Sequence, residues 1–229
     1  MPRSHRVDVG GEIYHCLNRS VGRQQIFHEA GDYQLFESIL EEVNNITNVD
    51  ILAYTIMPNH WHLVLRPEAD GDLSDFMKRL TVTHTQRYRV QTKTVGEGPV
   101  YQGRYKSFLI QEDTHLLTVL RYVERNPLTA KLVTDPLGWK YGSLYRRYKG
   151  ISEEKGLLVD WPVEEPSDYL QQVAAPLTSR EFEKLSPSKE KGVPFGDDGF
   201  VLDRVEKYNL GSTLRGRGRP PDTFEVGQL

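Results

Sequence analysis

The stretch Ile51–Leu65, ILAYTIMPNHWHLVL, decides the fold that this sequence predicts. Its two halves, residues 51–56 and 60–65, are mostly apolar and rich in β-branched and aromatic residues, which favour strands. Met57-Pro58-Asn59 separates them with residues typical of a tight turn. Two such runs joined by a short turn predict a β-hairpin, so we expect an antiparallel sheet around residues 51–65.

Working outward from this hairpin, the apolar spacing alternates between the period of a strand and that of a helix. The segments expected are strands at 12–18, 51–56, 60–65 and 104–110 and helices at 32–45, 72–89 and 112–126. The order β-α-β-β-α-β-α is typical of an α+β fold, a ferredoxin-like (split βαβ) antiparallel sheet with helices on one face.

The composition changes after Gly150, where Pro, Ser and Glu become frequent. We therefore expect two parts, residues 1–150 carrying the sheet and residues 151–229 forming an acidic linker and a mostly helical or irregular C-terminal extension. Residues 200–208 predict one helix there, and GRGRP at 216–220 forms a basic tail.

The overall composition is that of a globular domain, with 38% hydrophobic and 27% charged residues among 229. No apolar run approaches the roughly 18 residues that a membrane helix needs, and no secretory signal is expected at the N-terminus. Cys16 is the single cysteine, which excludes a disulfide framework and a cysteine zinc site within one chain. These features predict a cytoplasmic protein without a membrane partner.

The charge is unevenly distributed. The net charge of −3 argues against a nucleic-acid-binding protein, but residues 78–149 hold 14 Lys and Arg against 5 Asp and Glu. Residues 151–200 hold 5 against 11. A basic middle next to an acidic extension indicates a local nucleic-acid-binding surface that the average conceals.

The pair His60 and His62 is the first candidate for chemistry. Residues two apart in a strand share a face, so both imidazoles point the same way and Trp61 points to the other side. Two imidazoles can begin a divalent metal site but do not complete one. A hydrogen-bonded pair of strand histidines explains the same pattern, so this alternative stays open and further groups are required.

The helix expected at 112–126 offers such groups. Tyr122 and Asn126 lie one turn apart at the edge of its apolar stripe, where a tyrosine hydroxyl can face a cleft. Simple packing of the tyrosine ring is the alternative. Two histidines and an amide oxygen could hold a divalent ion that polarises a phosphate, while a tyrosine hydroxyl attacks it. Together the parts describe transesterification of DNA.

Several ordered motifs resemble one family. HWH at 60–62 resembles the His-hydrophobic-His motif of HUH endonucleases. MPNHWHLVL, YQGRYKSF and RYVERNPLTAKLV in this order resemble the single-tyrosine transposases, and within them the REP-associated tyrosine transposases, relatives of insertion-sequence enzymes. PFGDDGF and LGSTLRGRGRP also resemble segments of that group, so the likeness covers nearly the whole chain.

The resemblance implies a function and a site. It implies a metal-dependent single-stranded DNA transposase or endonuclease that cleaves and rejoins hairpin-forming, REP-like DNA through a 5′-phosphotyrosine intermediate. His60 and His62 would bind Mg²⁺ or Mn²⁺, and Tyr122 would be the nucleophile. Some insertion-sequence members have a Gln four residues after the tyrosine as third ligand, where this chain has Asn126. Relatives act as a monomer or a homodimer.

Basic residues could bind the DNA backbone, with the aromatic residues Tyr101, Tyr105 and Phe108 stacking on unpaired bases. The alternative, which strand alternation favours for Phe108, is that these aromatic residues belong to the core. The glycine-flanked arginines of the tail resemble a minor-groove arm, although a flexible basic tail is the alternative. The candidates are Lys78, Arg79, Arg87, Arg89, Arg104, Lys106, Arg121, Arg125, Arg217 and Arg219.

Two other functions remain open at this stage. One is a non-catalytic regulator that binds hairpin or single-stranded DNA on the same fold. The other is a zinc hydrolase that uses water, for which Glu124 is the sole nearby helix carboxylate. The helical wheel places Glu124 on the opposite side from Tyr122, which argues against it as a general base.

Overall fold

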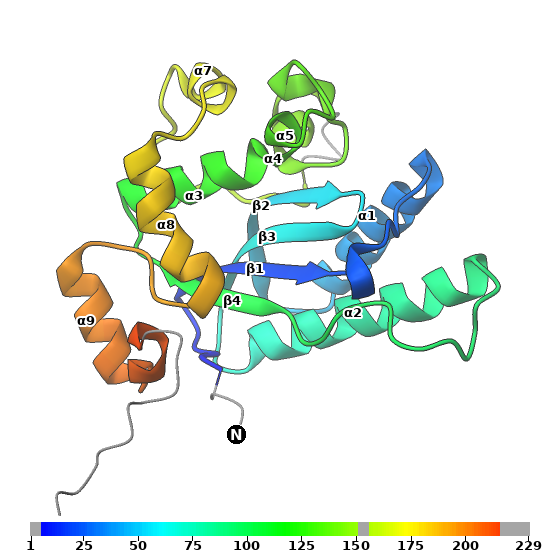
Figure 1. Ribbon diagram of the computed structural model, residues 1–229, viewed down its shortest axis with the longest axis horizontal. Helices are drawn as coiled ribbons and strands as arrows, with labels where there is room; N and C mark the ends of the chain where they lie inside the picture. The colour runs from blue at the N-terminus through cyan, green and yellow to red at the C-terminus, as the bar shows by residue number, and fades with distance from the viewer. Residues whose placement is uncertain (1–5, 151–155, 216–229) are drawn as a thin grey trace, which may run out of the picture.

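A four-stranded antiparallel sheet in the strand order β2-β3-β1-β4 forms the centre of the molecule (Figure 1). The structure is a computed structural model that describes residues 6–150 and 156–215. The strands are β1 (Ile13–Arg19), β2 (Val49–Met57), β3 (His60–Pro67) and β4 (Lys106–Ile110). Order and direction confirm the expected α+β, split-βαβ sheet. The two-residue turn Pro58-Asn59 joins β2 and β3 into the expected hairpin.

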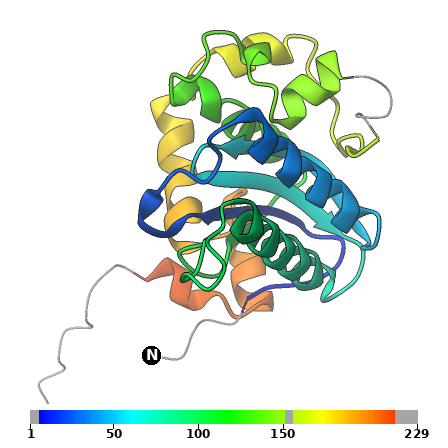
Figure 2. The same cartoon turned by 90° about the vertical axis from the view of Figure 1, so that its right-hand side faces the viewer.

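One face of the sheet is covered by α1 (Ala30–Asn44) and α2 (Asp72–Gln91), which lie side by side in Figure 2. The core between them and the sheet is fully buried and strongly aromatic, and it includes Phe36, Trp61 and Phe76. Both helices connect strands of the split βαβ unit, so they follow the expectation of a single helical face.

The opposite face is covered by α3 (Thr114–Glu124), which corrects the expectation that helices lie on one face only (Figure 1). β4 is the last strand, so α3 does not return to the sheet as a crossover and is free to pack on the other side. Val64 and Phe108 give this second face an apolar surface, and the stripe of Leu116 and Leu120 buries against it.

Both edges of the sheet are covered by later segments. Trp139 and Tyr141 bond to the backbone of Ile56 on β2. Phe195 forms a short parallel bridge with β4, donating its N–H to Leu109 O at 2.8 Å. Covering both edges leaves neither as a template for pairing with another strand.

The remaining helices belong largely to the part after β4. They are α4 (Asn126–Thr129), α5 (Ser143–Lys149), α7 (Tyr169–Ala174), α8 (Ser179–Lys191) and α9 (Asp198–Lys207), with 3-10 turns at Val21–Arg23, Pro136–Gly138 and Gly211–Leu214. α9 confirms the helix expected at 200–208. Tyr169, Val173, Leu185 and Phe195 are buried in the same core as α3, so the extension is packed onto the sheet domain. None of the described helices is long and apolar enough to cross a membrane.

Candidate active site

Strand register brings the two motif histidines beside the end of β1, on the face that α3 covers. His62 pairs with Leu17, and His60 pairs with Arg19. His15, two residues before Leu17, shares this face because side chains alternate along a strand. The resulting cluster lies between β1, β3 and the C-terminal turn of α3.

His60 and His62 face each other with ring centroids 5.1 Å apart at an interplanar angle of 76°. His60 Nδ1 lies 2.6 Å from Asn59 Oδ1, so it donates its proton there and leaves Nε2 as the free ligand atom. His62 Nδ1 lies 2.8 Å from His15 Nε2. His62 Nε2 is buried and has no hydrogen-bond partner in the described part of the chain. Both rings are therefore fixed through Nδ1, with Nε2 available.

Both histidines are kept in the neutral form that metal binding requires. Burial lowers the pKa of His60 to about 4, with a further contribution from the positive charge of Arg19. Burial also lowers the pKa of His62 well below its usual range, and His15, His60 and Arg19 add to this effect. Neither imidazole therefore carries a positive charge that would oppose metal binding at neutral pH.

These features fit a divalent metal ion. An orphaned, buried imidazole nitrogen is costly unless a ligand satisfies it. Among residues 6–150 and 156–215, no group of three or more His, Cys, Asp and Glu is arranged to hold a metal. Within these described segments, the donors are two imidazoles and neutral oxygens, which leaves coordination positions for phosphate oxygens.

Tyr122 lies in the last turn of α3 and faces this pair. Its ring centroid is 5.5 Å from that of His62, with the rings perpendicular, and 6.1 Å from that of His15. Burial raises the pKa of Tyr122 to about 12, while hydrogen bonding with Asn126 and the charge of Arg19 act in the opposite direction. The hydroxyl is therefore protonated at neutral pH.

Asn126 begins α4, immediately after α3. Its Nδ2 donates to the backbone carbonyl of Tyr122 at 2.7 Å, which holds the last turn of α3 together. The amide nitrogen is used within the helix, so Oδ1 is the atom that would bind a metal ion. The structure thus brings His60, His62 and Tyr122 together, and Asn126 contacts Tyr122 one turn further along the chain.

The C-terminal extension reaches the same site. Lys189 on α8 lies with its Nζ 4.6 Å from the ring centroid of Tyr122 and 4.6 Å from that of Phe182. Burial lowers the pKa of Lys189 from its usual value. Sequence analysis missed Lys189, His15 and Arg19. Of these, only His15 and Arg19 could have been found from the sequence, because alternation along the first strand places them on one face.

The predicted DNA-binding residues divide into two groups. Several are tied into the fold: Arg79 pairs with Asp75, Arg87 with Glu42, Arg121 with Glu181, Arg89 bonds to Gly98 O, and Arg125 bonds to the carbonyls of Val173 and Ala174. Arg121 and Arg125 hold the extension in place. Lys78, Arg104 and Lys106 are exposed and have no such partners among the residues described. Arg217 and Arg219 lie outside the described residues.

The proposed aromatic stacking platform is wrong. Tyr101, Tyr105 and Phe108 are at most 7% exposed, and the Tyr101 hydroxyl accepts a hydrogen bond from Trp61 Nε1 at 3.0 Å inside the core. Side chains that deeply buried cannot stack on bases. The error arose because a basic-aromatic alternation is also the pattern of a strand with one face buried.

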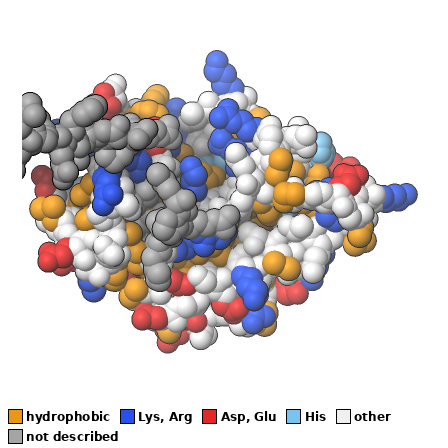
Figure 3. Space-filling model, turned by 60° about the horizontal axis from the view of Figure 1, so that its bottom comes forward, with side chains coloured by type: hydrophobic (Ala, Val, Ile, Leu, Met, Phe, Trp, Pro, Cys, Tyr) orange, Lys and Arg blue, Asp and Glu red, His pale blue; other side chains and the backbone are white. Residues whose placement is uncertain are grey.

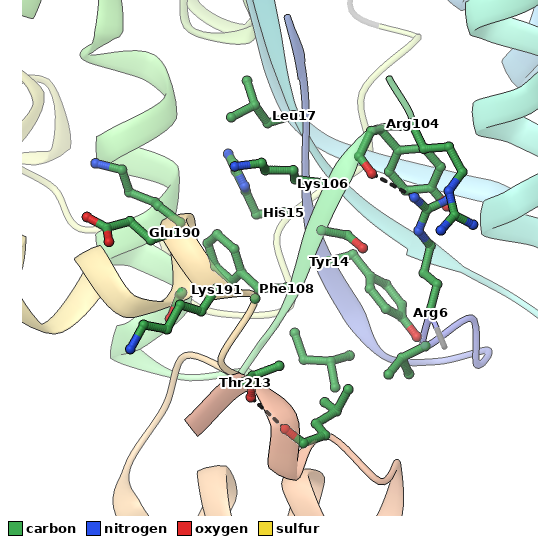
Figure 4. A pocket seen from close by; sticks show the side chains of 18 residues that line it. Arg6, Tyr14, His15, Leu17, Arg104, Lys106, Phe108, Glu190, Lys191 and Thr213 are labelled. Atoms are coloured by element: carbon green, nitrogen blue, oxygen red, sulfur yellow. Dashed lines mark hydrogen bonds between the residues drawn. The ribbon is translucent and has the colours of Figure 1, made fainter. Parts of the chain in front are cut away.

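A basic pocket of about 280 Å³ borders the histidine cluster, between β4 and α8. Figure 4 shows Lys106 and His15 entering it from neighbouring strands, with Lys191 on the opposite wall. Figure 3 shows Lys and Arg side chains bordering a hollow on one face of the molecule. Exposed cations next to the Tyr122 site suit a polyanion.

Glu124 has a structural role. It is 4% exposed and accepts hydrogen bonds from Ser143 Oγ at 2.6 Å and from the Tyr169 hydroxyl at 2.7 Å. It therefore joins α3 to α5 and α7 and faces away from the histidine pair, which argues against a hydrolase that uses Glu124 as base. Burial raises its pKa to about 7.

This shift predicts a pH-dependent stability. A carboxyl whose pKa rises from 4.5 to about 7 on folding stabilises the protein fully below pH 4.5, and this contribution is lost as the pH rises through about 7. Urea unfolding of the unmodified chain should show a free energy of unfolding lower by about 2.5 kcal/mol at pH 8 than at pH 5, and in Glu124→Gln this difference should disappear. The exposed Glu112→Gln is the control and should behave like the unmodified chain. Equal pH dependence in all three proteins would contradict the prediction.

Comparison with known proteins identifies the class. A family model described as "Transposase IS200 like" matches residues 9–126, and no curated protein matches the sequence. A solved REP-associated tyrosine transposase bound to a REP hairpin is 18% identical, with a TM-score of 0.54, covering 78% of this chain and all of that one. A candidate transposase from Deinococcus radiodurans is 19% identical with a TM-score of 0.39, covering 54% of this chain and 95% of that one.

The REP-associated enzyme shares the fold of this chain. The fold and the matched residues place the protein among the transposases, enzymes that act on DNA. More narrowly, the chain belongs to the IS200-like transposase family. The matched residues 9–126 include β1, the His60–His62 strand, Tyr122 and Asn126.

Proposed function

We propose that this protein is a metal-dependent transposase of single-stranded DNA that cleaves and rejoins hairpin-forming DNA through a 5′-phosphotyrosine intermediate. One observation carries the proposal: the Tyr122 ring lies 5.5 Å from a histidine whose buried Nε2 has no partner among the described residues. A nucleophile beside an unfilled ligand atom is the arrangement that phosphoryl transfer requires.

His60 and His62 would hold Mg²⁺ or Mn²⁺ through Nε2, with Asn126 Oδ1 as a third protein ligand. When bound, the ion would polarise the scissile phosphate as a Lewis acid. His15 and Asn59 orient the two imidazoles through hydrogen bonds of 2.8 and 2.6 Å, which fixes the direction of both Nε2 atoms.

Tyr122 would perform the chemical step. Its phenolic oxygen forms a bond to phosphorus, the bond from phosphorus to O3′ breaks, and the departing strand keeps a 3′-hydroxyl. The phenolic proton passes to solvent, and O3′ takes up a proton from solvent. The phosphotyrosine conserves the energy of the phosphodiester, so attack by a new 3′-hydroxyl rejoins strands without a cofactor such as ATP.

The basic pocket and the exposed cations Lys78, Arg104 and Lys106 support single-stranded DNA with a hairpin as the partner. The related solved enzyme was bound to a REP hairpin, which makes a hairpin the first substrate to test. The active form would be a monomer or a homodimer, and the molecular mass of the complex with this hairpin distinguishes the two. We further propose that residues 1–150 form the catalytic domain and that 151–229 assist it through Lys189.

A selection tests the proposed function. The protein is incubated with Mn²⁺ and a pool of end-labelled oligonucleotides. Each oligonucleotide contains one hairpin, and the sequences of its stem and of its flanks are random across the pool. Covalent protein–DNA adducts are isolated on a denaturing gel and sequenced. We expect an adduct that EDTA abolishes, and a family of related hairpins in the sequences. The absence of any adduct from the pool would contradict the proposal.

The alternative is a regulator that binds hairpin or single-stranded DNA without cleaving it. Such a protein would retain DNA from the same pool under native conditions, equally with Mn²⁺ and with EDTA, and form no covalent adduct. The neutral, preoriented pair His60 and His62 favours the catalytic function, because binding DNA alone does not require it.

The contact of Lys189 with Tyr122 gives a prediction for the extension. Lys189 lies over the ring whose oxygen gains negative charge during attack, so Lys189→Met should remove about 1 kcal/mol of transition-state stabilisation and slow single-turnover cleavage of the selected hairpin about fivefold. Lys184→Met, on the exposed side of α8, is the matched control and should cleave normally. Equal rates for the Lys189 variant and the control would show that the extension takes no part in cleavage.

A further inference from the structure

Arg19 lies beside the proposed site with a guanidinium that has no partner in the described residues. It ends β1, pairs in register with His60, and its Nε is buried without a hydrogen bond. Neither a hydrogen bond nor an ion pair of this guanidinium is found within residues 6–150 and 156–215. Arg66, near the other end of β3, shows the contrast: its Nε and Nη2 both bond to Asp50, at 3.1 and 2.8 Å.

The position of Arg19 is fixed by its backbone. Its N–H donates to Asn18 Oδ1 at 2.9 Å, and its carbonyl accepts from the N–H of Gln102 at 2.9 Å. β3 borders it on the other side through His60. The side chain therefore starts from a rigid point of the sheet, which is the condition for precise placement of a functional group.

The charge of Arg19 acts on the site and has no protein anion to balance it. Arg19 pairs directly with His60 across the two strands, and directly paired residues share a face of the sheet, so its side chain lies on the face of the histidine pair. A partly buried cation among neutral rings is costly unless an anion accompanies it. Since the described residues supply none, the fitting anion is one that arrives with the ligand.

We propose that Arg19 is a catalytic residue that binds the non-bridging oxygens of the scissile phosphate. The inference rests on the proposed function and adds a residue outside the histidine and tyrosine motifs. As Tyr122 attacks, negative charge grows on those oxygens, and the guanidinium donates hydrogen bonds to them while keeping its proton. The bond from Tyr122 oxygen to phosphorus forms as the bond to O3′ breaks.

The test compares Arg19→Gln and Arg19→Lys with the matched control Arg66→Gln, using the hairpin found by selection. We expect Arg19→Gln to slow single-turnover cleavage about 10²-fold or more, and Arg19→Lys to recover part of the rate. DNA affinity should change less than about threefold and Mn²⁺ affinity should stay the same, because Arg19 acts on one phosphate in the transition state. Arg66→Gln should cleave normally.

A neutral substrate separates a catalytic role from a structural one. The selected hairpin is prepared with a methylphosphonate at the scissile position, as separated diastereomers. We expect the defect of Arg19→Gln to shrink below about tenfold on this substrate, since much of the charge that Arg19 neutralises is absent. An equal defect on both substrates, weaker Mn²⁺ binding by Arg19→Gln, or no defect at all would overturn the inference. If the unmodified chain forms no adduct, the proposed function fails instead.

Discussion

Tyr122→Phe eliminates cleavage and the covalent adduct, with a rate loss of about 10⁴-fold or more, because no other oxygen nucleophile lies at that place on α3. The Tyr122 ring packs perpendicular to His62, and phenylalanine keeps this ring contact. Stability should therefore change by less than about 1 kcal/mol. Single-turnover cleavage of the selected hairpin measures the loss, and a filter-binding titration should give an unchanged DNA affinity.

The control for this variant is Tyr145→Phe on α5, which removes a tyrosine hydroxyl from another helix and should cleave at the normal rate. Cleavage with an adduct by the Tyr122 variant would contradict the assignment of the nucleophile. Loss of DNA binding together with cleavage would also contradict it, because the phenolic oxygen is assigned to chemistry alone.

His62→Ala is expected to have the second-largest effect. It should slow cleavage about 10³-fold and weaken the binding of Mn²⁺. His62 Nε2 is the buried atom without a partner among the described residues, so the substitution deletes the proposed metal-ligand atom. His15 then loses its hydrogen-bond partner, which should cost about 1–3 kcal/mol of stability. Isothermal titration with Mn²⁺ and single-turnover cleavage measure the two losses.

His28→Ala is the matched control for this variant, because His28 is exposed and lies before α1. It should bind Mn²⁺ and cleave like the unmodified chain. A His62 variant that binds Mn²⁺ normally but no longer cleaves would show that the histidine pair serves another purpose than metal binding.

The sheet and the core of the site could be predicted because local patterns determine them. The strand–Pro58-Asn59–strand pattern defines a hairpin by itself, and strand alternation alone places His60 and His62 on one face. The helical wheel placed Tyr122 at the edge of an apolar stripe, which is where α3 presents it. Each of these inferences needed only a few consecutive residues.

The remainder depends on contacts between distant segments, which a single sequence does not contain. The register of β1 against β3 brings His15 and Arg19 to the histidine pair, and a shift by one residue would turn both away. Arg121 was expected on DNA but pairs with Glu181, 60 residues later. The prediction that all helices lie on one face of the sheet was wrong for α3, because both faces of the sheet are apolar enough to accept its stripe.

The most direct test of the central claim is to locate the covalent bond. The protein is incubated with Mn²⁺ and the selected hairpin, the adduct is digested with trypsin and nuclease, and the modified peptide is sequenced by mass spectrometry. The account predicts a nucleotide joined through its 5′-phosphate to the Tyr122 oxygen, and no modified Tyr122 in a parallel reaction with EDTA. A nucleotide on any other residue, or cleaved DNA that never becomes attached to the protein, would contradict it.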